Sequence, residues 1–305
     1  MTAPTMQINA GLTMPGLASE HRLQAMLNGS AKKQLEERLA LEVEPPLWTA
    51  EFFKLTRTDL FLAANDSERE EILTLCSRSL VEEALLIEKC GMAFGAKMSA
   101  LSESTEERMF YNLMAGEEAI HYHQVRQFVP NNGEDVAPNA FHHLLARLIE
   151  NGDRDSLGFI IQVVLEGWGI SHYKTLAENT LSQKFSIELK EILKDESRHH
   201  GTGVILSKER TFSIETVEYT VKVLIEFLQM IQLGSQSVLG AVLNVLGELK
   251  KEQKITLLEQ LDSVKDSAET LQKLRSLMIL NGGEDIVLRL DALHCFTPYL
   301  AEDCL

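Results

Sequence analysis

Cysteine is scarce in this 305-residue chain, and the four that occur are scattered without a C-x-x-C pair: Cys76, Cys90, Cys295 and Cys304. This spacing argues against a zinc ribbon, a rubredoxin-type iron site and a disulfide framework, and it is consistent with a reducing cytoplasm. Basic residues are also missing before Arg22, and the N-terminal segment has no apolar core. We therefore expect no signal peptide.

Proline is rare, with seven in the chain, and alternating β-branched runs are nearly absent. Both features favour helices over strands. One stretch, 227–247, has no charged residue, but it holds three glutamines, two serines and an asparagine. Because these side chains are costly in lipid, we expect no membrane span there.

Basic residues are fewer than acidic residues, 29 against 45, and the net charge is −16. A surface of this sign repels phosphate backbones and anionic lipid, so nucleic-acid and membrane partners are both disfavoured. Apolar residues make up 45% of the chain and charged residues 24%. This composition is that of an ordinary soluble globular protein.

Helix caps and turn residues divide the chain into three regions. Residues 1–65 are an N-terminal extension with short helices, one of them near 31–41. Residues 66–210 hold four long helices. Residues 211–305 are helical by the spacing of Leu and Val, with a break at 281–283, and they either pack on the bundle or form a homodimer interface. The long helices are expected at 66–101, 105–128, 155–179 and 183–207, with a short helix at 140–150, so the fold class is all-α.

An internal repeat relates two pairs of these long helices. Shifting the sequence by 78 residues lays 88–121 on 166–199 without a gap. Five positions are then identical and a sixth is acidic in both halves: Glu88/Glu166, Gly91/Gly169, Ser104/Ser182, Glu118/Glu196, His121/His199 and Glu117/Asp195. The shared residues are metal-ligand types, a helix cap and a glycine, as expected for a diverged duplication that keeps one site.

The spacing around the two serine caps brings four carboxylates to one level of an antiparallel bundle. Glu118 and Glu196 lie 14 residues after their caps, and Glu88 and Glu166 lie 16 residues before them. At about 1.5 Å per residue, each carboxylate is roughly 20–24 Å from its turn. Within each Glu-x-x-His motif the two side chains project from one helix face. Carboxylates with imidazoles suit iron or manganese, and four carboxylates offset two divalent cations.

The pattern E-x27–30-[DE]-E-x-x-H, present twice, resembles the ferritin-like di-iron carboxylate superfamily. Its members include rubrerythrins, ribonucleotide reductase small subunits, aldehyde-deformylating oxygenases and amine N-oxygenases. The resemblance covers about 66–207 and implies a ferritin-like four-helix bundle with additional helices at both ends. It implies two iron ions, or one manganese and one iron, bound by Glu88, Glu118, His121, Glu166, Glu196 and His199. It also implies that Glu117 and Asp195 accept imidazole N–H groups from the opposing motif, with a solvated helix charge as the alternative.

The roles of several residues near the predicted ligands allow two interpretations. Glu83 competes with Glu88 as the ligand on the first long helix, and Glu88 is preferred because it shares an apolar stripe with its neighbours. His172 and Tyr173 either line a pocket beside the metals or pack in the core. The paired glycines, Gly91 and Gly169, either leave room for O2 or substrate or allow close helix packing.

The resemblance implies an oxidoreductase, an O2-activating oxidase or oxygenase that acts on a small organic substrate in the cytoplasm. Electrons would come from a separate ferredoxin or reductase. Ribonucleotide reductase small subunits place a radical tyrosine four residues after the first motif histidine, where this chain has Val125, so that role is disfavoured. Two alternatives stay open: a rubrerythrin- or ferritin-like protein that detoxifies peroxide or iron, and a structural or interaction protein with a vestigial site. The missing cysteine iron site argues against the first, and the complete ligand set against the second.

Overall fold

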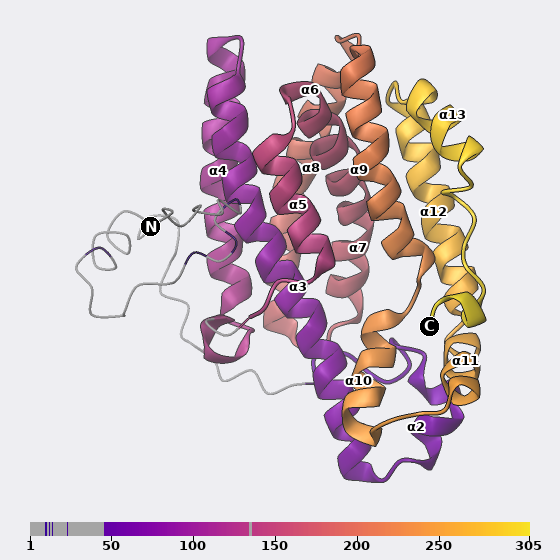
Figure 1. Ribbon diagram of the computed structural model, residues 1–305. Coiled ribbons are helices and arrows are strands. Elements are labelled where there is room, and N and C mark those ends of the chain that lie inside the picture. The colour runs from indigo at the N-terminus through magenta and orange to yellow at the C-terminus, as the bar shows by residue number, and fades with distance from the viewer. Residues whose placement is uncertain (1–9, 11, 13, 15–22, 24–45, 134–135) are drawn as a thin grey trace, which may run out of the picture. The chain divides into compact units, whose positions relative to one another are not determined.

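The computed structural model describes residues 10, 12, 14, 23, 46–133 and 136–305, and within them every regular element is helical. Figure 1 shows these helices and their connections. The prediction of an all-α chain is confirmed for this part of the sequence. The short helix predicted near 31–41 lies outside the described residues.

The long helices begin at the predicted caps. The side chain of Ser104 accepts the Glu107 N–H at 3.1 Å, and the side chain of Ser182 accepts the Phe185 N–H at 3.2 Å. Such bonds satisfy amides that the first turn of a helix leaves without an intrahelical partner. The main helices are α3 (Asp66–Leu101), α4 (Thr105–Arg126), α5 (Ala140–Asn151), α7 (Glu166–Asn179), α8 (Gln183–Lys208), α9 (Ile214–Gln232), α10 (Gln236–Leu246), α11 (Lys251–Gln260), α12 (Ser263–Leu280) and α13 (Glu284–Ala292). Shorter elements are η1 (Leu55–Arg57), α2 (Asp59–Ala63), η2 (Pro130–Gly133), α6 (Arg154–Leu157), η3 (Gly158–Leu165) and η4 (Ala301–Asp303).

The helix predicted at 155–179 is not one regular α-helix. Between α6 and α7 the segment η3 is a π-helix, and α7 begins at Glu166. The sequence of η3 is apolar except for Gln162, and its residues 159–164 are all buried. A segment buried on every side carries no periodicity that could distinguish a π-helix from an α-helix. π-helical turns inside α-helices are frequently found at functional sites.

Contacts between residues divide the chain into two compact units. One boundary falls within α3, between residues 80 and 81, and another falls between α5 and α6. Among the described residues, the first unit contains 10, 12, 14, 23, 81–133 and 136–151, and the second contains 46–80 and 152–305. The predicted division into an extension, a bundle and a C-terminal region stays a prediction.

In the first unit, α3 contacts both α4 and α5. Phe94 on α3 meets Tyr111 on α4 edge to face, with ring centroids 6.2 Å apart. Lys97 donates to the carbonyl oxygens of Ile149 and Glu150 at the end of α5, at 2.5 and 2.9 Å. A cation at a helix C-terminus satisfies carbonyls that have no partner within the helix.

In the second unit, the segment before α2 is anchored by Trp48. This side chain is fully buried, its indole N–H donates to the Leu176 carbonyl of α7 at 3.1 Å, and its ring meets Phe185 of α8 edge to face. Farther along, the buried amide of Gln232 at the end of α9 donates to the carbonyls of His294 and Thr297. Both ends of this unit are therefore tied to its long helices.

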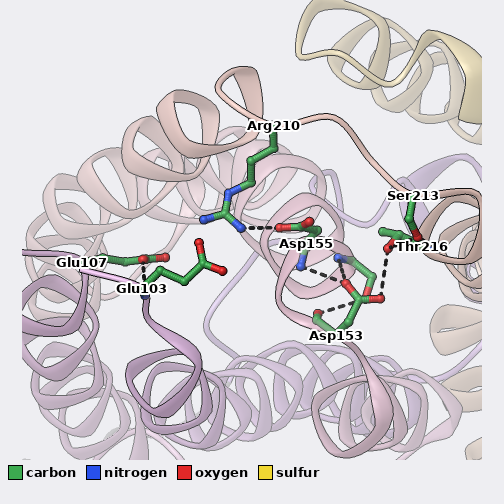
Figure 2. Close-up of polar contacts among 8 residues, drawn as sticks. Glu103, Glu107, Asp153, Asp155, Arg210, Ser213 and Thr216 are labelled. Atoms are coloured by element: carbon green, nitrogen blue, oxygen red, sulfur yellow. Dashed lines mark hydrogen bonds and ion pairs between the residues drawn. The ribbon is translucent and has the colours of Figure 1, made fainter. Parts of the chain in front are cut away.

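A polar network joins α6 to the connection between α8 and α9 within the second unit (Figure 2). Asp153 caps α6 by accepting the N–H groups of Asp155 and Ser156, both at 2.9 Å, and it also accepts the Thr216 hydroxyl at 3.4 Å. Arg210 forms an ion pair with Asp155. Charge-assisted bonds of this kind are stronger than neutral ones.

No helix in the described part of the chain is both long and apolar enough to cross a membrane. The uncharged stretch 227–247 is divided between α9 and α10. Gly234, at φ 70°, lies in the turn between them. This left-handed conformation suits glycine because it has no Cβ.

Candidate metal centre

In the first unit, α3 and α4 bring together Glu88, Glu118 and His121. All three side chains are buried, and their ligand atoms lie within 4.8 Å of one another. His121 Nδ1 is 3.4 Å from Glu88 Oε2 and 3.7 Å from Glu118 Oε2. This Glu/His group could hold a metal ion.

In the second unit, α7 and α8 bring together Glu166, Glu196 and His199, again with ligand atoms within 4.8 Å. His199 is fully buried, and both glutamates are half-buried. His199 Nδ1 is 3.6 Å from Glu196 Oε1. Both units therefore turn the same ring nitrogen of the motif histidine towards the glutamate three residues before it.

The donor set of these groups fits a divalent metal ion. Within each unit the named residues supply two carboxylates and one imidazole: Glu88, Glu118 and His121 in the first, and Glu166, Glu196 and His199 in the second. Two ionised carboxylates held close together in a buried site repel each other, and a divalent cation would offset both charges. Oxygen ligands with imidazole nitrogen suit iron and manganese, whereas soft metals favour thiolates.

Gly91 makes room for one candidate ligand. It lies on α3, three residues after Glu88, and a Cβ added there would lie 2.4 Å from Glu118 Oε2 and 2.7 Å from its Cδ. Real Cβ atoms essentially never lie this close to another heavy atom, so a side chain at position 91 would require the Glu118 carboxylate to shift. At Gly169 on α7, an added Cβ would meet nothing within 4 Å.

Glu83, the rival to Glu88, has a different environment. Glu88 joins the Glu/His group of the first unit, and Glu83 does not. The Glu83 carbonyl accepts the Nε2–H of His142 at 3.3 Å, so this residue lies where α3 meets α5. Burial raises the pKa of the Glu83 carboxyl.

Four further residues were expected close to the ligands: Glu117, Asp195, His172 and Tyr173. Asp195 forms an ion pair with Arg198 on its own helix, at 2.7 Å, and Glu117 is half-buried on α4. His172 stacks on the ring of Trp168, with centroids 5.4 Å apart, and burial lowers the pKa of its imidazole to about 4. Tyr173 is buried, and its ring lies 6.3 Å from that of His172. The roles of these residues beside the metals stay predictions.

Cys90, two residues after Glu88, is buried, and burial raises the pKa of its thiol to about 12. Thiolate, not thiol, is the metal-binding form of cysteine. Burial of Cys90 therefore favours the protonated thiol over the thiolate.

Gln162 was missed in the sequence analysis. It is fully buried in η3, and its side-chain amide donates to the carbonyl of His199 at 3.1 Å. The signal in the sequence was a single amide in an apolar run from Phe159 to Leu165. A buried polar side chain of this kind requires a hydrogen-bond partner, which the sequence could not identify.

We compared the chain with protein families, curated proteins and solved structures. No family, curated protein or solved structure matches it.

Proposed function

We propose that the chain is a ferritin-like di-metal oxidoreductase whose four-helix bundle consists of α3, α4, α7 and α8. The observation that carries the proposal is the equivalence of the two Glu/His groups. Residues matched by the 78-residue offset form, in each unit, a group of two glutamates and one histidine with ligand atoms within 4.8 Å. A chance cluster would not reproduce the same residue types, the same spacing and the same ring nitrogen.

We further propose that the two groups serve one centre, which binds two iron ions or one manganese and one iron. The donor set supports this proposal, since ferritin-like di-metal centres take one Glu from each of two helices and a Glu-x-x-His motif from each of two others. The four glutamates would neutralise two divalent cations, and the two imidazoles would add neutral donors. When bound, the metals would supply the electrons with which O2 is reduced.

The proposed reaction is the O2-dependent oxidation of a small organic substrate, with electrons from a separate ferredoxin or reductase. The chain's own side chains would bind the metals and compensate their charge. Apolar residues around them would exclude water, and in the second unit the buried face of η3 contributes such residues. Metal-site pockets in bundles lie between helices and are mostly apolar.

Metal stoichiometry tests the centre. After anaerobic loading with Fe(II), we expect about two iron ions per chain, and Glu118→Ala or Glu196→Ala should remove most of this metal, because the buried charge is then uncompensated. Glu106→Ala and Glu191→Ala, at exposed positions of the same two helices, are the matched controls. Full occupancy in both ligand variants would reject the proposed centre.

The product of the reaction with O2 separates oxygenase from iron handling. The reduced protein should consume O2 in a single turnover without an organic substrate and then stop. Sustained oxidation of excess Fe(II) to a mineral would instead support the ferritin-like alternative.

A further inference from the structure

Gln162 is the only polar side chain with hydrogen-bonding groups in the π-helical segment η3, and it is fully buried. Its side-chain Nε2 donates to the carbonyl oxygen of His199 at 3.1 Å. We propose that Gln162 is a positioning residue for the Glu/His group of the second unit. This inference rests on the proposed metal function.

A second hydrogen bond joins the same two segments in the opposite direction. His200 Nδ1 lies 2.9 Å from the carbonyl oxygen of Gln162. Because a carbonyl can only accept, the His200 ring is the donor. Gln162 therefore donates a hydrogen bond from its side chain to the His199 backbone and accepts one at its own backbone from the His200 side chain. The backbone of His199 is held through its carbonyl, and the following side chain is held through its ring.

Close packing reinforces this link. Gly203 lies one turn after His199, and a Cβ added there would lie 2.4 Å from Gln162 Cβ and 3.3 Å from its carbonyl carbon. On the other side, a Cβ added at Gly167 would lie 2.7 Å from His200 Cε1. Glycine at both positions therefore allows η3 and the start of α7 to approach α8 closely.

The location of η3 connects these contacts to the candidate ligands. η3 ends at Leu165, and Glu166 is the first residue of α7. The rotation of Glu166 about the helix axis therefore depends on the π-helical turn before it. By fixing η3 to α8 at His199, Gln162 sets Glu166 and His199 relative to each other. Ligand geometry must be held within about 0.5 Å for a metal site to function, and supporting contacts provide that precision.

The first half of the repeat does not contain these residues and serves as an internal reference. The 78-residue offset places Ala84 opposite Gln162, Tyr122 opposite His200 and Val125 opposite Gly203. The close contact there is the one between Gly91 and Glu118. The effect of removing Gln162 should accordingly be confined to the His199 group.

Gln162→Met tests the proposal, because methionine keeps the length of the side chain and removes the donor. The matched control is Gln232→Met, which removes another buried amide donor to backbone carbonyls in the same unit. Co(II) is the probe, and its binding is followed by visible absorption. Supporting residues typically contribute 10- to 100-fold to metal affinity, so we expect Gln162→Met to bind Co(II) at least about tenfold more weakly than wild type with an altered spectrum. Gln232→Met should bind as wild type. Equal effects of the two substitutions would overturn the proposal.

A measurement on the metal-free protein separates this inference from the proposed function. With ¹⁵N-labelled histidine, the ring resonances of His199 should move in Gln162→Met and in Gly203→Ala, whose new Cβ displaces Gln162, while those of His121 stay in place. A wild-type protein that binds no Co(II) would reject the metal function, and the His199 resonances would still decide the positioning role. Unchanged His199 resonances in both variants would reject that role even if the wild type binds metal.

Discussion

The carboxylate of Glu118 fills the space that a side chain at Gly91 would need, because an added Cβ would lie 2.4 Å from Glu118 Oε2. The matching glycine of the repeat, Gly169, has no atom within 4 Å of an added Cβ. Identical residues at equivalent positions thus have different environments. Close packing, one of the two interpretations considered for the glycines, applies to Gly91, where the packed atom belongs to a candidate ligand. Room for O2 or a substrate stays an interpretation for Gly169.

We predict that Gly91→Ala impairs metal binding and Gly169→Ala does not. The new methyl group at position 91 must displace the Glu118 carboxylate, so we expect roughly tenfold weaker Co(II) binding, as for loss of a contact that orients a ligand. At position 169 the substitution should only improve helix propensity, by about 0.5–1 kcal/mol. Co(II) titration and thermal unfolding of both variants check these outcomes. Equal Co(II) affinities in the two variants would show that Glu118 is not a ligand or moves without cost.

We predict that Glu88, and not Glu83, is needed for metal binding. Glu88 is 2% exposed and lies 3.4 Å from His121 Nδ1, whereas Glu83 is half-buried at the α5 contact. Glu88→Ala should lower the bound metal by at least half after anaerobic loading, because an incomplete ligand set leaves buried charge uncompensated. Glu83→Ala should keep the wild-type metal content. The opposite result, measured by elemental analysis, would exchange the two assignments.

The starts of α4 and α8 could be predicted from sequence because their signals are local. Ser104 and Ser182 cap α4 and α8, as predicted. The pairing of Glu88 with His121 followed from a longer-range regularity, the 78-residue repeat, which fixes register without any knowledge of packing.

The π-helical segment η3 could not be predicted in the same way. Its residues 159–164 are all buried, so their order does not report the helical period. The contact between Gln162 and His199 joins residues 37 positions apart, and nothing in the local sequence specifies it. Likewise, Gly91 and Gly169 are indistinguishable in sequence, and only the neighbouring helix determines that one faces a carboxylate and the other open space.

We predict that Asp155→Asn destabilises the fold without changing metal affinity. The Arg210–Asp155 pair has side-chain exposures of 21% and 28%, and it ties α6 to the end of α8 (Figure 2). Losing its charge-assisted bond should cost about 1 kcal/mol of unfolding free energy. Glu191→Gln breaks the exposed Lys194–Glu191 pair, with exposures of 64% and 49%, and should cost less than about 0.5 kcal/mol. Urea unfolding measures both, and equal losses would contradict the prediction.

We predict that the stability of the protein falls as the pH drops from about 6.5 to about 4, in part through His142. This side chain is buried, its Nδ1 accepts the Asn139 N–H at 3.2 Å, and its Nε2–H donates to the Glu83 carbonyl. Burial lowers the pKa of His142 from 6.5 to about 4. Between these two values the unfolded chain binds more protons than the folded one, so acid favours unfolding. A pKa difference of this size lowers the free energy of unfolding by about 3 kcal/mol once the pH is below both pKa values.

His142→Gln isolates this contribution, because glutamine at the third position of a helix can keep the reciprocal cap with Asn139 and does not titrate. His172, whose pKa is also lowered to about 4, should continue to contribute in the same range of pH. We therefore expect the fall in unfolding free energy between pH 6.5 and pH 4 to become shallower by roughly 2.5 kcal/mol in His142→Gln, but not to vanish. His143→Gln, at the exposed neighbouring position, should retain the wild-type slope. Identical slopes in the two variants, from urea unfolding at a series of pH values, would show that His142 is protonated equally in the folded and unfolded chains.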